Sequence, residues 1–239
     1  MQSITEILRV LFDVPLKQNE IKYFRGAVIE SVLRNKPYFD AKEIKTDLFH
    51  NHNEKKDDLT HTLTRYPLIQ YTQFGGKAAI VAIGLGVQAL KAFLEIMPGQ
   101  LQFNNRVYRF GILDEFLSID EITQPDVLQY YQLTNWIGLK EDKYALWQQT
   151  EAFRERISIL EDALHGSISR LMYCLEPSLG NVTSPVIYDF LKKDVQAYKT
   201  FNLNTFDLIF SSCYVLPGYV CIGKGCGLGF GQLAKFRKN

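Results

Sequence analysis

The chain has 239 residues, 46% of them hydrophobic, which is enough to bury the core of one large domain or of two small ones. Its 27 Lys and Arg residues are balanced by 26 Asp and Glu residues. This balance excludes the strong basic excess of proteins that bind nucleic acid over most of their surface, so an anionic partner must bind to a local patch.

The C-terminal end of the sequence carries such a basic patch. After Asp207 the chain contains no carboxylate side chain. The same segment has four basic residues: Lys224, Lys235, Arg237 and Lys238. Because a basic chain end is often only a solvated surface, the patch does not identify a partner by itself.

The sequence begins without the basic and apolar segments of a secretory leader, and no apolar run reaches membrane-spanning length. We therefore expect a cytoplasmic protein that does not enter a membrane. The four cysteines form no C-x-x-C pair, which favours reduced thiols over a disulfide framework or a zinc site.

The first third of the chain predicts a strand, a helix and a hairpin. Residues 4–13 predict the strand, and Asn19 is a candidate N-cap for a helix over residues 21–33. The apolar residues of this helix recur at helical spacing: Ile21, Phe24, Val28 and Val32. After a polar, charged stretch, the runs 66–72 and 77–83 flank Phe-Gly-Gly, which predicts a β-hairpin.

The next elements complete a first domain. Residues 87–97 predict a helix, and residues 101–110 predict one further strand. The resulting order, βαββαβ, is typical of a ferredoxin-like domain. We assign this domain to residues 1–125.

The same pattern restarts in the second half, residues 126–239. Residues 127–139 predict extended chain, and one apolar stripe predicts a long helix over residues 153–175. Short β-like runs with glycine between them follow. The halves share no obvious identity, so the repetition is one of pattern. The expected fold class is α+β, with tandem ferredoxin-like domains.

Two glycine motifs are similar to known nucleotide-binding motifs. Gly84, Gly86 and Ala89 fit the G-x-G-x-x-A pattern of a dinucleotide-binding turn. However, the strand expected next has no acid at its end for a ribose hydroxyl, and a hairpin stands where a parallel sheet should begin. We favour a tight strand-to-helix turn, with an NAD(P)-binding enzyme as the weaker alternative.

Residues 218–225, GYVCIGKG, come close to the phosphate-binding loop of nucleoside triphosphatases. Gly225 replaces the hydroxyl residue that would hold magnesium. Too little chain follows to form the helix whose N-terminus should bind phosphate. We do not expect a nucleoside triphosphatase.

Three of the four histidines lie in the polar connection after the first predicted helix: His50, His52 and His61. Long loops often carry functional residues. In many proteins, however, surface histidines in loops have no function. The neighbouring carboxylates follow no standard metal-ligand spacing. His165 lies on the long predicted helix with Glu161 one turn earlier, and we expect a local hydrogen bond there.

The stretch Gly223–Gly231, GKGCGLGFG, contains five glycines in nine residues. Glycine is needed where φ is positive or where another group approaches the backbone closely. One interpretation is a tight β-connection. The favoured one is a loop whose backbone N–H groups approach phosphate oxygens while Lys224 adds a positive charge.

These features together resemble the CRISPR-associated endoribonucleases of the Cas6 family, in the RAMP superfamily, and within it the b-type group. The resemblance rests on the His-bearing loop, on RYPLIQY, on the Gly-Leu-Gly turn and on LPGYVCIGKGCGLGFGQL. It covers nearly the whole chain and is strongest at residues 48–90 and 205–233. The family's glycine-rich motif is similar to GIGKSVSxGFG, so Gly225 and Gly227 stand where serines are common.

The resemblance implies two RRM-related ferredoxin-like domains and an endoribonuclease that serves antiviral defence. Such proteins bind the repeat of a CRISPR precursor transcript and cut it once per repeat, without a cofactor. The RNA-binding residues implied here are Gly223, Lys224, Gly225, Gly227, Gly229 and Gly231. Other CRISPR-associated proteins or a second copy of the chain are partners that the sequence leaves open.

Cleavage of this kind needs no metal if the ribose 2′-hydroxyl attacks the adjacent phosphate, which leaves a 2′,3′-cyclic phosphate and a 5′-hydroxyl. Histidine suits the proton transfers near neutral pH. The resemblance implies that His50 or His52 is the catalytic residue, and the sequence does not choose between them. Lys22 and Tyr23 are candidate partner groups that are equally compatible with a surface and a core role.

Two further alternatives stay open. The chain could hold processed guide RNA as a catalytically inactive subunit of an interference complex. It could also be a scaffold that assembles through its long helix.

Overall fold

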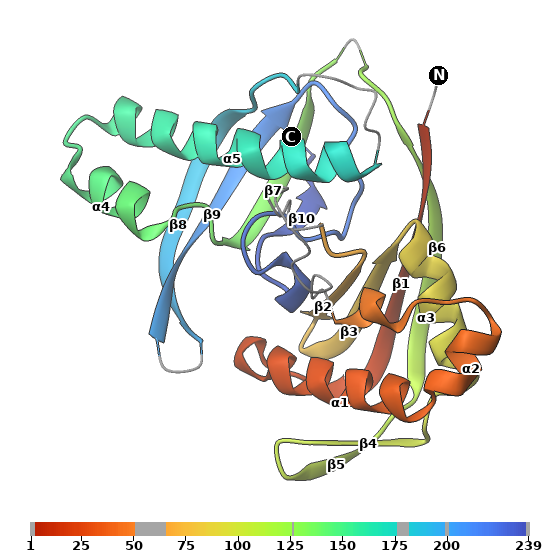
Figure 1. Ribbon diagram of the computed structural model, residues 1–239. Coiled ribbons are helices and arrows are strands. Elements are labelled where there is room, and N and C mark those ends of the chain that lie inside the picture. The colour runs from red at the N-terminus through yellow and green to blue at the C-terminus, as the bar shows by residue number, and fades with distance from the viewer. Residues whose placement is uncertain (1–2, 51–65, 126, 176–181, 199–200, 238–239) are drawn as a thin grey trace, which may run out of the picture. The chain divides into compact units, whose positions relative to one another are not determined.

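The computed structural model describes residues 3–50, 66–125, 127–175, 182–198 and 201–237 (Figure 1). Backbone contacts divide the chain into two compact units. The N-terminal unit consists of residues 5–120 together with residues 227–229. The C-terminal unit contains residues 121–226 and the chain from residue 230 onward.

The N-terminal unit is a βαββαβ fold with additions. Its strands are β1 (Ser3–Pro15), β2 (Ile69–Phe74), β3 (Lys77–Ile83), β4 (Gln100–Phe103), β5 (Arg106–Arg109) and β6 (Ile112–Ile122). Its α-helices are α1 (Ile21–Arg34), α2 (Lys36–Ala41) and α3 (Leu85–Glu95), and its short 3₁₀ helices are η1 (Gln18–Glu20) and η2 (Thr46–Phe49). The main sheet has the order β2-β3-β1-β6.

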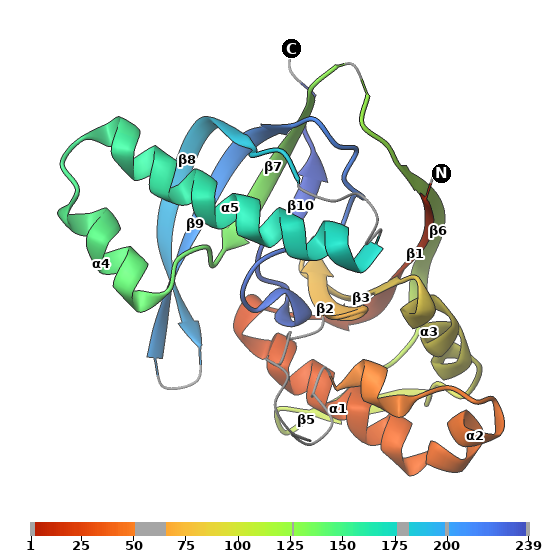
Figure 2. The ribbon, with the colours of Figure 1, turned by 45° about the horizontal axis from the view of Figure 1, so that its top comes forward.

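The helices of this unit lie beside its main sheet in Figure 2, and residues of both the sheet and the helices form one hydrophobic core. Because successive side chains of a strand point to opposite faces, alternate residues of β1 enter this core. They are Leu8, Val10, Phe12 and Val14. Phe12 stacks on Phe110 with ring centroids 4.5 Å apart, and Phe24 of α1 contacts both rings.

Two local predictions were wrong in this unit. Residues 101–110 do not form one strand of the main sheet but the separate hairpin β4–β5. Its turn is formed by Asn104 and Asn105, which both take positive φ, as a two-residue hairpin turn requires. The fourth sheet strand is β6. In addition, Asn19 is not the N-cap of α1, because it lies within η1 and Glu20 occupies the cap position.

The C-terminal unit repeats the same strand order. Its elements are β7 (Gln129–Trp136), α4 (Glu141–Gln149), α5 (Phe153–Leu175), β8 (Val186–Tyr198), β9 (Phe201–Ser212) and β10 (Gln232–Lys235). The sheet order β10-β7-β9-β8 places the first and third strands in the centre, as in the N-terminal unit. A glycine-rich segment with the short η4 (Cys226–Leu228) takes the place of a second helix. The prediction of tandem ferredoxin-like domains is confirmed.

Aromatic rings attach the unpredicted helix α4 to the C-terminal sheet. The Trp147 ring lies 5.3 Å from the ring of Phe206 on β9. The Lys193 ammonium, on β8, lies 5.1 Å from the ring centroid of Tyr144. The apolar pattern within α4 is weak, and the contacts that hold the helix are made with residues far away in the sequence. Its local sequence therefore does not indicate a helix.

Of the four cysteines, Cys221 and Cys226 are buried, and Cys174 and Cys213 are partly buried. Within the described parts of the chain, no helix is long and apolar enough to cross a membrane.

The Gly-Leu-Gly turn between β3 and α3 is explained by packing within the chain. Gly84 has a φ of +53° and is the N-cap residue of α3. A Cβ atom on Gly86 would lie 2.4 Å from the backbone oxygen of Leu68. Furthermore, β3 pairs with both neighbours in antiparallel fashion, unlike the parallel sheet of a dinucleotide-binding fold. The tight-turn interpretation is therefore the one that the structure supports.

Gly86→Ala should destabilise the protein, because its methyl group would overlap a backbone oxygen that cannot move independently. We expect a lower midpoint of thermal unfolding. Gly166→Ala on α5 is the matched control, since no atom of the described residues outside the adjoining helix backbone and chain neighbours lies within 4 Å of its added Cβ, and alanine favours helix by about 1 kcal/mol. A stable Gly86→Ala protein would contradict the packing explanation.

Candidate functional site

His50 directly follows η2 in the N-terminal unit. It is partly buried, and its backbone N–H donates to the carbonyl of Asp47 at 2.9 Å. His52 and His61 lie outside the described residues. The structure therefore places only one of the two candidate catalytic histidines.

Two side chains from other elements hold the backbone at His50. The Arg25 guanidinium, on α1, donates through Nη2 to the carbonyl oxygen of His50. The Tyr71 hydroxyl, on β2, donates to the carbonyl oxygen of Phe49 at 3.2 Å. Burial raises the pKa of Tyr71, so its hydroxyl stays protonated and able to donate. Two successive carbonyl groups are thus bound to α1 and to β2.

The tip of the glycine-rich segment, residues 227–229, belongs to the same unit. Gln18 Nε2 donates to the carbonyl oxygen of Leu228 at 3.3 Å, and the Leu228 side chain packs against the core. Gly229 has a φ of +75°, and a Cβ there would lie 2.9 Å from Ile21 Cδ1 and 3.0 Å from Thr72 Oγ1. The tip therefore lies against the start of α1 and the edge strand β2.

The loop tip and the His50 backbone are attached to neighbouring parts of the same two elements. Ile21, beside the tip, and Arg25, which binds His50, are one helical turn apart on α1, or about 6 Å along its axis. On β2, Thr72 beside the tip directly follows Tyr71. Two motifs that lie far apart in the sequence are thereby brought together within the N-terminal unit.

The other loop glycines lie in the C-terminal unit, where close contacts account for them. Gly223, Gly225 and Gly231 all have positive φ. A Cβ on Gly223 would lie 2.5 Å from Trp136 Nε1, and one on Gly231 would lie 2.0 Å from the backbone oxygen of Ile222. These glycines are therefore required by the fold of the loop itself.

Lys224 is the exposed cation of this segment. Its backbone forms an isolated β-bridge with Ile137, and its flanking glycines take the positive φ angles of the turn. The rigid backbone thus presents an ammonium group to solvent.

Lys22 and Tyr23, the candidate partner groups, lie on the first turn of α1. Tyr23 is 44% exposed, which excludes the core role that the sequence left open. The Lys22 ammonium lies 4.7 Å from the centroid of the Tyr23 ring. They form a basic, aromatic surface on the helix that also carries Arg25.

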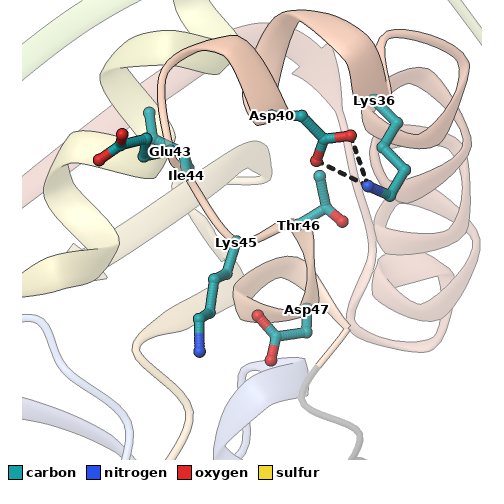
Figure 3. A pocket seen from close by; sticks show the side chains of 7 residues that line it. All are labelled: Lys36, Asp40, Glu43, Ile44, Lys45, Thr46 and Asp47. Atoms are coloured by element: carbon teal, nitrogen blue, oxygen red, sulfur yellow. Dashed lines mark hydrogen bonds and ion pairs between the residues drawn. The ribbon is translucent and has the colours of Figure 1, made fainter.

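A shallow pocket of about 400 Å³ opens beside η2 (Figure 3). It is lined by residues of α2, of the connecting segment and of η2 itself: Lys36, Asp40, Glu43, Ile44, Lys45, Thr46 and Asp47. The Lys36 ammonium pairs with the Asp40 carboxylate at 2.6 Å. Among the described residues, no group of three or more His, Cys, Asp and Glu side chains is placed to hold a metal ion.

The long-helix histidine has a different partner from the one expected. His165 Nε2 lies 2.8 Å from the carbonyl oxygen of Val182, and Glu161 instead accepts a hydrogen bond from the backbone N–H of Ile187. The predicted local bond between His165 and Glu161 is wrong, because His165 binds Val182, which precedes β8, and Glu161 binds Ile187 within β8. They connect α5 to the sheet.

Sequence reasoning missed Arg25 and Tyr71. Tyr71 belongs to the RYPLIQY run, but its hydroxyl contact depends on the tertiary fold. Only a weak pattern indicated that Arg25 has a structural role: a charged residue directly follows buried Phe24 on a largely apolar helix.

Comparison with known proteins identifies relatives over both halves of the chain. The Cas6b N-terminal domain model matches residues 4–116, and the Cas6b C-terminal domain model matches residues 122–236. No curated protein matches the chain.

Several solved structures share the fold. A crystal structure of Cas6b has a TM-score of 0.74 at 21% identity, and one of a CRISPR RNA processing endoribonuclease Cas6b has a TM-score of 0.62 at 19% identity. Csf5, a CRISPR-Cas type IV Cas6 crRNA endonuclease, has a TM-score of 0.52 at 15% identity. Each comparison covers 98% of this chain and 100% of the other. Since the two domain models together span nearly all of the sequence, the chain belongs to the Cas6b family.

Proposed function

We propose that this chain is an endoribonuclease that binds CRISPR repeat RNA and cleaves precursor crRNA by attack of a ribose 2′-hydroxyl on the adjacent phosphate. The observation that carries this proposal is the attachment of the His50 backbone and the glycine-rich loop tip to neighbouring parts of α1 and β2. Membership in the Cas6b family and the names of the similar structures supply the substrate class.

The proposed reaction needs two proton transfers. A base takes the 2′-hydroxyl proton as the 2′-oxygen forms its bond to phosphorus, and an acid gives a proton to the departing 5′-oxygen. The products are a 2′,3′-cyclic phosphate and a 5′-hydroxyl. We assign one transfer to His50 or His52. Positive groups near the phosphate, such as Lys22, stabilise the added negative charge in the transition state.

RNA binding is assigned to the glycine-rich segment. Its turn geometry, with positive φ at Gly223, Gly225, Gly229 and Gly231, holds backbone N–H groups and the exposed Lys224 in a defined arrangement. Contacts to phosphate give affinity with little dependence on base identity.

The histidine assignment is tested by single-turnover cleavage of repeat RNA. We expect either His50→Ala or His52→Ala to lower the rate constant by about 10²–10⁴-fold, because a general acid or base is lost. Wild-type rates in both variants would contradict the assignment. Replacing the 2′-hydroxyl at the cut with hydrogen should abolish cleavage by the wild-type protein without abolishing binding.

The assignment of RNA binding to the glycine-rich segment is tested by measuring the RNA affinity and the thermal unfolding of the same variant. Lys224→Ala should weaken repeat RNA binding, reduce the slope of log K against log salt by about 1, and leave thermal unfolding unchanged. Lys143→Ala, which removes an exposed charge from α4, is the matched control. Equal affinities for wild type and Lys224→Ala would remove Lys224 from the interface.

Gly231→Ala should lower stability, because its Cβ would lie 2.0 Å from the Ile222 oxygen and its φ of +72° disfavours alanine. The measurement is thermal unfolding without RNA. Unchanged unfolding would contradict the packing role of this glycine.

An inactive crRNA-binding subunit is the alternative function. Tight binding of repeat RNA by the wild-type protein, with no cleavage under single-turnover conditions, would favour it.

A further inference from the structure

We infer that Arg25 is a positioning residue, which fixes the direction in which the His50 imidazole leaves the backbone. This inference rests on the proposed function. It concerns a residue that no family pattern in the sequence indicated, and it acts through a backbone contact.

The end of η2 needs such a contact. The last carbonyl groups of a helix have no partner within it. Here η2 has only four residues, so few internal hydrogen bonds hold its end. Tyr71 supplies the partner for Phe49, and Arg25 supplies the partner for His50.

The charge of Arg25 strengthens this role. A hydrogen bond from an ionised donor is roughly twice as strong as a neutral one. Among the described residues no carboxylate forms an ion pair with Arg25. Its guanidinium is thus directed to a carbonyl group and is not held by a neighbouring acid.

The Arg25 side chain is partly buried, which favours a structural role over RNA contact. Its Nε atom is buried and has no hydrogen-bond partner among the described residues. Leaving a buried donor unsatisfied is costly, and an exposed arginine that serves only solubility does not incur that cost. The hydrogen bond from Nη2 to the His50 carbonyl therefore holds the side chain in place, although Nε forms no hydrogen bond with a described residue in that position.

Loss of Arg25 should thus affect the chemical step more than RNA binding. We expect Arg25→Ala to lower the single-turnover rate constant at saturating repeat RNA by about 10- to 100-fold, because small misplacements of a reacting group have effects of this size. The dissociation constant should change less than twofold, and its salt dependence should not change. Arg25→Lys should recover part of the rate, since an ammonium group can bind the same carbonyl oxygen.

Arg34→Ala is the matched control. Arg34 lies on the same helix, pairs with Glu30 on the surface and has a 75% exposed side chain. Its removal changes the net charge by the same amount, so its cleavage rate should equal that of the wild type. Thermal unfolding and RNA affinity of each variant show whether the fold is kept.

A double-mutant comparison decides whether Arg25 acts through His50. Combining Arg25→Ala with His50→Ala should cause no further loss of rate beyond that of His50→Ala alone. If Arg25→Ala lowered the cleavage rate as much in the His50→Ala background as in the wild type, the inference would be overturned. A reduced affinity with a smaller salt slope, which would mark Arg25 as a phosphate contact, or a wild-type cleavage rate in Arg25→Ala would also overturn it.

The failure of this inference can be told apart from that of the proposed function. If the wild-type protein binds repeat RNA but does not cut it, both fall. If the wild-type protein cuts the RNA and Arg25→Ala cuts it equally fast, only the role of Arg25 falls.

Discussion

The carbonyl groups at the end of η2 are the constraint on which the candidate site depends. A short helix cannot satisfy its own last carbonyls, so side chains from elsewhere must bind them. In this chain Tyr71 and Arg25 do so, and each comes from an element that also contacts the glycine-rich tip. The same hydrogen bonds that complete the backbone of His50 therefore set its place relative to residues 227–229.

Much of the fold follows from local sequence patterns. Alternation along β1 and the hairpin at Phe74-Gly75-Gly76 predict their elements because each pattern reflects one buried face. Residues 101–110 were mistaken for one strand, because the apolar spacing on both sides of Asn104 and Asn105 hides the turn. Helix α4 was missed since Trp147 finds its apolar contacts on β9, far along the chain.

The candidate site was predictable only in part. The residue types of His50 and Lys224 indicate proton transfer and anion binding directly. The sequence could not show the role of Arg25, because its partner is a backbone oxygen that any residue would supply. For the glycines, sequence alone could not distinguish a ligand from the protein as the close neighbour, and at Gly223 and Gly231 the neighbours include Trp136 and Ile222.

Residues 227–229 belong to the N-terminal unit, and this limits how the chain can be divided. The Gln18 side chain forms a hydrogen bond with the Leu228 carbonyl although the two residues are 210 positions apart in the sequence. A polypeptide ending at residue 120 would lack the segment beside Ile21 and Thr72, so no single cut in the chain yields both compact units complete. Substitutions at Ile21 or Thr72 and substitutions at Gly229 therefore alter the same contact.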